Sequence, residues 1–538
     1  MKIFKKIGIG ILAACIAIGA TGCGNGGNGG NSGGGGNGGN GGGGTLVITA
    51  LEQGYGVKWL NGIVDAYKKK TGSDVKVVKK IGGAGQTSIE TEISSLSNKT
   101  DIFITEKEGY FKSVRAGAVT VNGVKYDSYY ENLNDVYNAE LEGENGATIK
   151  SKMVKDYLEY NDVDGNYYSL PWQNGVLGIV LNLDVWNKLG YTASDIPRTT
   201  EEMFEICDEI VAKSKTDASL KNVAPFIYSA ESEYYSSFLH MWMAQYEGEK
   251  SFGYFINGKD PDGEVSEYVY TFDGQKKALQ VIDRLLDKTS GYQHGNSDEL
   301  SFTDMQSYFL SDQAAFCVNG SWLDIEMENY KDKAMEFIPT PVISDITEKF
   351  DDASDKTDAK LREVIDFVDE HKNKGDNTGK PSGVTDGDVE IVREARQMKY
   401  KRGNCGQVFV PSFSTKIEQA KKFLKFMYSD EGLNIYYDTM NGATLPLSLS
   451  TGSYADKSGM SVFRKNIKAV IEEGCCVNIN LAGKARIYSV GGVSTNFNNG
   501  SLGLAPYYLR NKEYTVQQII DKNQAYVSDN WQKIKNAL

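Results

Sequence analysis

Early in the folded part of the chain, the apolar positions change repeatedly between the spacing of a strand and the spacing of a helix. Residues 45–51 are apolar and β-branched, which predicts a buried strand. Apolar residues then recur at i, i+3, i+4 and i+7, which predicts a helix that ends at Gly72. Strands are predicted over 75–78 and 100–105, with a helix over 88–96 between them. Because strands and helices alternate, the pattern is typical of a parallel, doubly wound sheet, and the expected fold class is α/β.

The rest of the chain continues this mixture of elements. We expect a loop at the glycine run 82–85 and a hairpin turn between Tyr160 and Tyr167. Further strands are predicted over residues 176–183, 314–318, 337–343 and 405–410. Further helices are predicted over residues 197–212, 230–247, 272–287, 417–428 and 517–538. The charged stretch 344–404 keeps helical apolar spacing, so we expect an inserted pair of helices there.

The first residues have the pattern of a secretory signal. Three lysines precede a nearly continuous apolar run, and small residues follow it, which predicts a signal peptide over residues 1–22. The run is shorter than the roughly 20 residues that a membrane-spanning helix needs. Ala20-Thr21-Gly22-Cys23 resembles a bacterial lipoprotein box, with Ala20 in place of the usual Leu, which implies cleavage before Cys23 and a lipid on its thiol. Residues 24–44 contain only Gly, Asn and one Ser, so residues 23–44 would form a lipidated cysteine with a flexible tether.

The charge of the chain argues against some classes of partner. The sequence holds 58 Lys and Arg against 71 Asp and Glu, for a formal net charge of −13. Removal of residues 1–22, which contain three lysines and no acidic residue, would leave about −16. An acidic protein of this kind is a poor candidate for binding nucleic acid, so we expect no nucleic-acid partner.

The cysteines and histidines give little support to a metal site. Five cysteines follow Cys23, namely Cys207, Cys317, Cys405, Cys475 and Cys476, and an odd number leaves at least one unpaired. We expect buried free thiols, although the adjacent Cys475 and Cys476 could also bind a metal or form a bridge. The three histidines, His240, His294 and His371, form no HxxxH pair. We therefore expect no metal, no cofactor and no histidine-based catalysis.

Four stretches resemble, in the same order, segments of the solute-binding proteins of ABC importers, the extracellular family that includes maltose-binding protein. They are residues 164–191, 197–210, 311–322 and 420–436. The third reads SDQAAFCVNGSW and is similar to a G-K-A-A-M-x-x-x-G-x-W segment, with Asp312-Gln313 in place of Gly-Lys. Leu181 and Glu201 replace a usual Tyr and Trp in the first two. The charged stretch 344–404 is where the resemblance is thinnest.

The resemblance implies a two-lobe fold like that of the periplasmic binding proteins. Each lobe would be a doubly wound sheet flanked by helices, and hinge segments would join the two lobes. The expected N-terminal lobe comprises residues 45–155 with 337–428, including the helical insertion 344–404. The expected C-terminal lobe comprises residues 156–336 with 429–538.

The resemblance also implies a function. A lipid-anchored monomer on the outer face of the cell membrane would capture an extracellular sugar or oligosaccharide between its lobes. It would then deliver the ligand to the membrane permease subunits of an ABC import system, without catalysis.

A sugar site needs amides or carboxylates for the hydroxyls and flat rings for the apolar face. The expected C-terminal lobe supplies aromatic rings and polar groups from two places: Trp172 beside Asn174, and Trp322 beside Asn319 and Ser321. The strand ends of the first lobe would supply the facing side chains, and two more aromatic residues are candidates that core packing explains as well. The complete predicted set is Glu52, Tyr55, Glu106, Trp172, Asn174, Tyr228, Trp242 and Trp322.

Two alternatives fit parts of the same pattern. An exported glycoside hydrolase needs two carboxylates about 5–10 Å apart, and Glu52 and Glu106 could in principle form such a pair. The same receptor fold could also bind a peptide, a polyamine or an anion. The absence of an Arg or Lys cluster at the predicted strand ends weakens the anion alternative.

Overall fold

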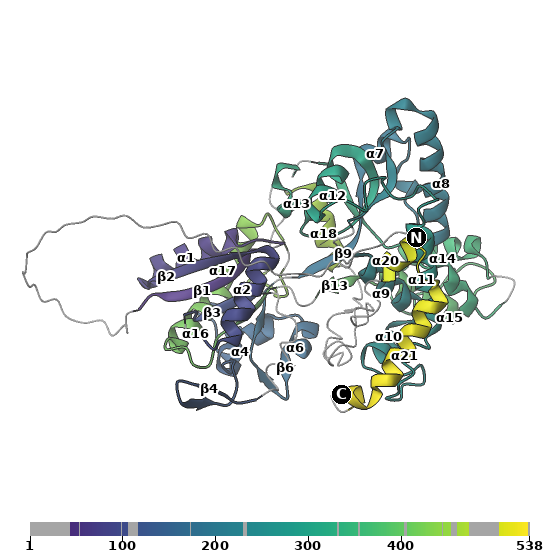
Figure 1. Ribbon diagram of the computed structural model, residues 1–538. Coiled ribbons are helices and arrows are strands. Elements are labelled where there is room, and N and C mark those ends of the chain that lie inside the picture. The colour runs from purple at the N-terminus through teal and green to yellow at the C-terminus, as the bar shows by residue number, and fades with distance from the viewer. Residues whose placement is uncertain are drawn as a thin grey trace, which may run out of the picture. The chain divides into compact units, whose positions relative to one another are not determined.

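A computed structural model describes most of the chain after the tether (Figure 1). The described residues are 44–52, 54–97, 99–105, 117–172, 174–229, 234–330, 333–352, 356–402, 406–443, 445–452, 460–472 and 505–535. The expected signal peptide, the lipidated Cys23 and nearly all of the tether lie outside these ranges, as do Glu106, Cys405, Cys475 and Cys476. Within them, no helix is both long enough and apolar enough to cross a bilayer.

The first sheet contains five strands in the order β2-β1-β3-β14-β8. Their bounds are β2 Val75–Ile81, β1 Leu46–Glu52, β3 Ile102–Thr105, β14 Gln407–Phe409 and β8 Leu170–Pro171. β1 is parallel to both β2 and β3, whereas β14 is antiparallel to β3 and β8. The predicted parallel core of the sheet is confirmed, and two short strands from later in the chain extend it.

The second sheet is arranged around one long buried strand, β9 Gly175–Asn182. The strand order is β10-β11-β9-β12, and β13 also pairs with β9. The bounds are β10 Ala224–Ile227, β11 Ala314–Gly320, β12 Met335–Ile338 and β13 Tyr400–Arg402. β11, β12 and β13 are all antiparallel to β9, and every residue of β9 is buried. A strand covered on both faces is apolar throughout, which is why the sequence of β9 does not alternate.

Helix α1 (Lys58–Thr71) shows how local sequence builds the layer on the first sheet. Its apolar face buries five residues, namely Trp59, Leu60, Ile63, Val64 and Tyr67. It ends at Gly72, whose φ of 69° allows its N–H to bond to the carbonyl of Lys68. α16 (Ile417–Met427) and α17 (Asp430–Thr439) pack against α1. Short helices α4 (Asn134–Asn138), α5 (Ile149–Lys152) and α6 (Lys155–Asn161) complete this part.

Two local predictions have opposite outcomes. Asp164 and Gly165 have φ of 54° and 82° between β6 (Asp162–Val163) and β7 (Asn166–Tyr167), so the hairpin turn is confirmed. The glycine run 82–85, expected as a loop, is instead the first turn of α2 (Gly82–Ser94). Glycine weakens a helix but does not exclude it. Gly85 lies so close to Lys80 that a Cβ on Gly85 would be 2.5 Å from the carbonyl carbon of Lys80.

A second small hairpin is formed by β4 (Val119–Val121) and β5 (Val124–Tyr126).

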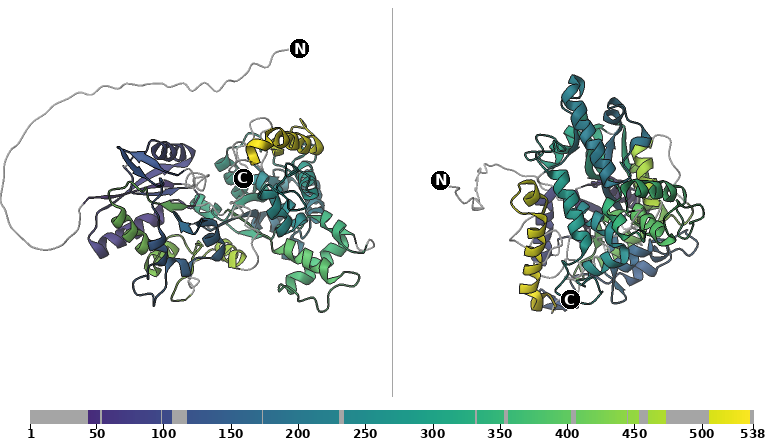
Figure 2. Two further views of the ribbon diagram at one scale, coloured as in Figure 1. Left: turned by 90° about the horizontal axis from the view of Figure 1, so that it is seen from below. Right: turned by 90° about the vertical axis from the view of Figure 1, so that its right-hand side faces the viewer.

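The helices around the second sheet include most of the amphipathic segments predicted from the sequence. They are α7 (Leu183–Lys188), α8 (Thr200–Thr216), α9 (Tyr234–Glu247), α10 (Glu249–Ile256), α11 (Asp273–Leu286), α12 (Phe302–Tyr308), α13 (Leu323–Glu326), α18 (Val462–Glu472), α20 (Ala505–Arg510) and α21 (Val516–Lys535). The inserted pair is α14 (Asp358–Glu370) and α15 (Asp386–Gln397), which pack against each other. In Figure 2 this green pair lies beside the teal helices that cover the second sheet.

The strand pairing divides the chain differently from the expected lobe boundaries. β12 pairs with β9, and α15 packs on α9, so the segment from 335 to 402 belongs with the second sheet and not with the first. Conversely, α17 packs on α1 of the first sheet. We therefore call residues 44–172 and 406–452 the first lobe, and the remaining described residues the second lobe. An apolar run specifies a buried strand but not the sheet that it joins, and that choice is where the expectation failed.

The chain crosses between the lobes at the ends of adjacent strands. One crossing joins β8 to β9 through Trp172, and another joins β13 to β14. The two are in contact, because the backbone N–H of Trp172 donates to the carbonyl of Gly406 at 2.9 Å. Short strand crossings of this kind are typical hinges between rigid lobes.

Candidate ligand site at the junction of the lobes

The turn after β1 carries Tyr55 to the second lobe. Gly54 and Gly56 on either side have φ of 56° and 62°, conformations that glycine adopts without steric cost. The Tyr55 side chain is buried, and its hydroxyl lies 2.5 Å from Oγ of Ser321, which follows β11. That Oγ also accepts a hydrogen bond from the N–H of Val176 on β9, at 3.1 Å. The turn after β1 of the first lobe is thus hydrogen-bonded to the turn after β11 of the second, and Ser321 of that turn is in turn bonded to β9.

Trp322 fills the space beside this hydrogen bond. Its indole lies against two glycines: a Cβ at Gly320 would be 2.3 Å from its Cη2, and one at Gly175 would be 3.2 Å from its Cζ3. The Trp322 ring is 6.3 Å from the Tyr55 ring at an interplanar angle of 77°, and 6.2 Å from the Tyr234 ring. Tyr55 and Trp322, both predicted from the sequence, therefore lie together at the junction.

A buried ion pair lies close to these rings. Arg464 on α18 is completely buried, and its Nη2 donates to Oδ1 of Asp324 on α13. Burial raises the pKa of the Asp324 carboxyl, and the guanidinium opposes that effect. Tyr55 and Tyr436 are near enough to Arg464 to interact with it electrostatically.

Several buried polar atoms around the junction have no hydrogen-bond partner among the described residues. We call them the unpaired polar set: Nε1 of Trp172, Oη of Tyr436, and Nε and Nη1 of Arg464. Burial raises the pKa of the Tyr436 phenol, so this hydroxyl keeps its proton and can donate it. Each buried donor without an acceptor costs about 1–3 kcal/mol. The oxygens of a bound ligand would supply the acceptors that these donors lack.

The structure places Trp172 in an aromatic core of the first lobe. Its ring is fully buried, stacks on Trp59 at 4.7 Å, and meets the rings of Tyr428 and Tyr436 edge-on at 5.0 and 5.3 Å. Only its Nε1 belongs to the unpaired polar set. The neighbouring Asn174 is also buried, and its Oδ1 accepts a hydrogen bond from the Tyr157 hydroxyl at 2.9 Å.

Three other predicted residues do not join Tyr55 and Trp322. Trp242 is buried in the second-lobe core, where its Nε1 donates to the carbonyl of Pro341 at 3.1 Å. Tyr228 donates to Asp298, and the guanidinium of Arg510 lies 5.0 Å from the centre of its ring. Glu52 forms a half-exposed ion pair with Lys79 at 3.2 Å.

The described cysteines are inert and no metal cluster is present in the described ranges. Cys207 and Cys317 are both buried and free, as predicted, and burial raises the pKa of each thiol. Among the residues that the structure describes, no three His, Cys, Asp or Glu side chains come close enough together to hold a metal ion.

The family of the chain follows from its sequence. The sequence model described as bacterial extracellular solute-binding protein matches residues 62–460, which is most of the chain. The chain belongs to the bacterial extracellular solute-binding proteins. No curated protein sequence matches it significantly.

Solved structures show that the fold of this solute-binding protein is shared at low sequence identity. A chitin oligosaccharide binding protein is 14% identical with a TM-score of 0.60, and the match covers 91% of this chain and 99% of that one. RafE in complex with raffinose is 15% identical with a TM-score of 0.56, covering 90% and 98%. The GacH receptor of Streptomyces glaucescens, solved unliganded and with acarbose, is 14% identical with a TM-score of 0.55, covering 91% and 98%.

Sequence reasoning missed several junction residues of this solute-binding protein, namely Asp324, Tyr436 and Arg464. Arg464 carried a usable signal, because it lies three residues before Ile467 and seven before Ile471 and therefore on the apolar face of α18. An arginine on an apolar helix face is almost always paired. Asp324 and Tyr436 carried no such signal, since an acid in a first helical turn and a tyrosine on an apolar face are both common.

Proposed function

We propose that this solute-binding protein captures a sugar or an oligosaccharide at the junction of its two lobes. The observation that carries the proposal is the combination of two rings, Tyr55 and Trp322, with the unpaired polar set. A sugar ring offers an apolar C–H face to an aromatic ring and hydroxyl oxygens to hydrogen-bond donors. Sites of this kind discriminate sharply, because a buried donor that finds no acceptor is costly.

Two further observations support this assignment. The chitin oligosaccharide binding protein, RafE with raffinose and GacH with acarbose share the fold. Among the described residues that we assign to the junction, the cationic side chain is Arg464, and its guanidinium is paired with the Asp324 carboxylate. A neutral, hydroxyl-rich ligand fits these surroundings better than an anion.

The proposal includes how the protein is anchored at the membrane and how it delivers its ligand. After removal of residues 1–22, a lipid on Cys23 would anchor the monomer outside the cell, and residues 24–44 would tether it. A ligand that contacts both lobes binds the closed form more tightly than the open form, and it shifts the population towards closure. The crossings at Trp172 and Gly406 would act as the hinge, and the closed form would deliver its ligand to the permease subunits of an ABC importer.

A thermal-shift screen against a panel of oligosaccharides tests the ligand class, because a ligand that binds only the folded form raises Tm by mass action. The best ligand is then titrated calorimetrically into Trp322→Phe and Trp186→Phe variants. Trp186 is the matched control, since it is buried in the second lobe and its Nε1 donates to the carbonyl of Thr192. We expect Trp322→Phe to weaken binding roughly tenfold, or about 1.4 kcal/mol, and Trp186→Phe to leave the dissociation constant unchanged. Equal effects of the two substitutions would contradict the assignment of Trp322.

The same ligand serves to test for catalysis. Glu52, one of the two carboxylates that a hydrolase would need, is engaged by Lys79 at 3.2 Å. We expect the oligosaccharide to remain intact after prolonged incubation with the protein, as measured by the concentration of reducing ends. A steady release of reducing ends, absent from a heat-treated sample, would favour the hydrolase alternative.

A further inference from the structure

A cavity lies entirely within the second lobe, and we call it the second cavity to distinguish it from the junction site. Its volume is about 460 Å³, within the range of about 300–1,000 Å³ typical of small-molecule sites. It is bounded by Leu177 of β9, by the end of β12, and by the C-terminal ends of the inserted helices α14 and α15. None of Tyr55, Ser321, Trp322 or Arg464 lines it, so it is separate from the junction site.

The wall of this cavity is largely apolar. Its walls include Leu177, Phe337, Val368, Met398 and Tyr400 from both the sheet and the insertion. Phe337, Met398 and Tyr400 are already buried, so they form a preorganised surface. Such a wall favours the apolar body of a ligand through the hydrophobic effect, at roughly 25 cal/mol for each Å² removed from water.

The rim of the cavity is cationic, although the whole chain carries a formal charge of −13. Lys372, Lys374, Arg396 and Lys399 line it, against one acid, Asp369. Asp369 is already bound by Arg396, whose Nε and Nη2 donate to its two oxygens at 2.9 and 2.8 Å. Nη1 of Arg396 is buried and has no partner among the described residues. The charge of Asp369 is therefore neutralised by Arg396, and among the residues that line the cavity the positive side chains outnumber the negative ones.

We propose that this cavity binds a small carboxylate with an apolar body, such as an aryl or short alkyl acid. The apolar body would occupy the wall, and the carboxylate would lie at the rim, where charge-assisted hydrogen bonds from Lys374 and Arg396 can reach it. The site is a product of the insertion 344–404, since without α14 and α15 the wall of β9 and β12 would face solvent. The insertion therefore adds a second ligand site to the lobe instead of extending the junction site.

The test uses three carboxylates, benzoate, 4-phenylbutyrate and hexanoate, each with the alcohol of the same carbon skeleton. Calorimetric titration of the full chain should give saturable binding of at least one acid with a dissociation constant of about 1 mM or tighter. The matching alcohol should bind roughly tenfold more weakly or worse. No saturable binding of any acid up to about 5 mM, or equal binding of acid and alcohol, would overturn the proposal.

Variants connect the binding to this cavity. Lys372→Glu/Lys374→Glu reverses two exposed charges of the rim and should weaken acid binding roughly tenfold. Lys422→Glu, at an exposed position of α16 in the first lobe, is the matched control and should leave it unchanged. Acid binding should also survive Trp322→Phe, so a failure of the sugar proposal does not affect this test. Loss of acid binding in Lys422→Glu, or its retention at full strength in the rim variant, would contradict the location.

Discussion

The hydroxyls of Tyr55 and Ser321 lie 2.5 Å apart, although 266 positions separate them along the chain. Tyr55 belongs to the turn after β1 in the first lobe, and Ser321 belongs to the turn after β11 in the second. Ser321 also accepts from the backbone of β9, so its hydroxyl is held in place. This contact directly joins the lobes, and it lies beside Trp322, the residue that we assign to ligand stacking.

Tyr55→Phe should loosen the contact between the lobes. A hydrogen bond contributes about 0.5–1.5 kcal/mol net, so the closed population of the ligand-free protein should fall by a few-fold. Small-angle scattering without ligand should give a larger radius of gyration for the variant. Tyr137→Phe is the control, because the Tyr137 hydroxyl donates to the carbonyl of Ser169 within the first lobe. An unchanged radius in Tyr55→Phe would show that this bond does not set the closed population.

Gly320→Ala should displace the Trp322 ring. The added Cβ would be 2.3 Å from Cη2 of the indole, which is far inside van der Waals contact, so the ring must move. We expect ligand binding to weaken at least tenfold, as measured by calorimetry. Gly253→Ala on α10, where an added Cβ meets nothing within 4 Å, should bind normally and gain about 0.5–1 kcal/mol in unfolding free energy. Normal ligand binding by Gly320→Ala would show that the position of Trp322 is unimportant.

Removing one partner of the Arg464–Asp324 ion pair should lower the free energy of unfolding more than removing both partners. Arg464→Met leaves a buried carboxylate without its partner, and the unfolding free energy should fall by about 3–5 kcal/mol. Arg464→Met/Asp324→Leu removes both charges and should recover much of that loss in a denaturant titration. If the refolded double variant still binds its oligosaccharide weakly, Arg464 has a role in binding beyond its structural one. Equal stability of the single and double variants would mean that the pair is not coupled.

Asp430 should control part of the acid stability of the first lobe. It pairs with Lys152 at 2.7 Å and accepts hydrogen bonds from Ser450 and Thr451. Burial alone would raise the pKa of Asp430, but these donors outweigh burial and lower it. A lowered pKa means that the stabilisation is fully present above the unfolded value of about 3.9 and is lost as the pH falls towards the folded value.

Asp430→Asn should therefore cost at least about 2 kcal/mol of unfolding free energy at pH 7 and flatten its decline between about pH 4 and pH 2. Denaturant titrations at several pH values measure both effects. Asp65→Asn, an exposed position of α1, is the control and should leave the profile of the parent protein intact. An acid limb of unchanged steepness in Asp430→Asn would refute this assignment.

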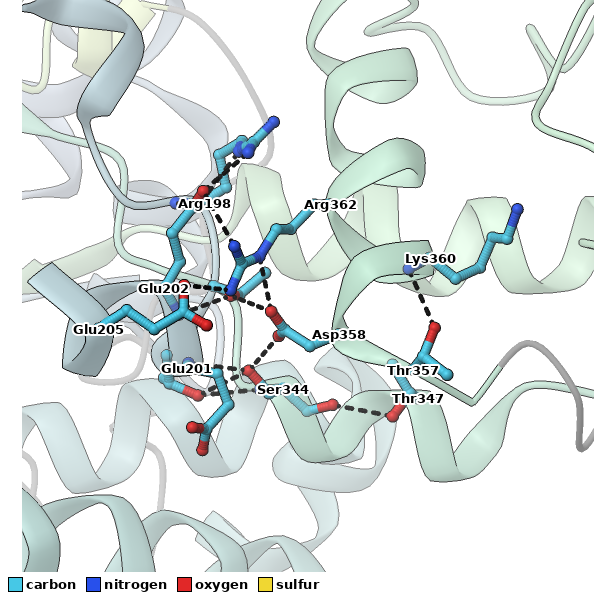
Figure 3. Close-up of polar contacts among 12 residues, drawn as sticks. Arg198, Glu201, Glu202, Glu205, Ser344, Thr347, Thr357, Asp358, Lys360 and Arg362 are labelled. Carbon is cyan, nitrogen blue, oxygen red and sulfur yellow. Dashed lines mark hydrogen bonds and ion pairs between the residues drawn. The ribbon is translucent and has the colours of Figure 1, made fainter.

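Asp358, the first residue of α14, links the insertion to Thr199 at the start of α8. Figure 3 shows its carboxylate between Ser344, Arg362 and the first turn of α8. It accepts from Ser344 Oγ at 2.7 Å, from Arg362 Nε at 2.7 Å and from Thr199 Oγ1 at 3.1 Å. Asp358→Ala leaves three donors without their acceptor, so hydrogen exchange in α14 should accelerate markedly.

Two readouts make this test specific. Oligosaccharide binding at the junction should be unchanged in Asp358→Ala, whereas carboxylate binding to the second cavity should weaken, because α14 forms part of its wall. Glu370→Ala, at an exposed position of the same helix, is the control for local effects. Unaltered exchange in α14 of Asp358→Ala would show that other contacts suffice to dock the insertion.

Local pattern was sufficient to predict many elements but not their partners. The spacing of Leu60, Ile63 and Val64 predicted α1, and the apolar run at 176–183 predicted β9. The strand at Phe337 was also predicted, yet its sheet was not, because pairing of β12 with β9 depends on residues far away in the sequence. The lobe boundaries were misplaced for the same reason.

At the candidate site too, the sequence predicted individual residues but not the contacts that they make. Trp322 was singled out because Asn319 and Ser321 lie beside it, and the structure adds that Gly175 and Gly320 make room for its indole. Trp172 lies beside equally polar residues, but its ring packs on Trp59, a contact that no local pattern could reveal. The ion pair of Arg464 and Asp324 joins two helices 140 positions apart, so it becomes visible only in three dimensions.

The central claim is that Tyr55 and Trp322 bind a hydroxyl-rich ligand where the two lobes meet. Its most direct measurement is a crystal structure of the protein grown with the best oligosaccharide from the thermal-shift screen. We predict a sugar ring stacked on the Trp322 indole, with sugar oxygens within hydrogen-bond distance of at least two members of the unpaired polar set. A sugar bound elsewhere, with Trp322 still packed only on protein atoms, would contradict the account.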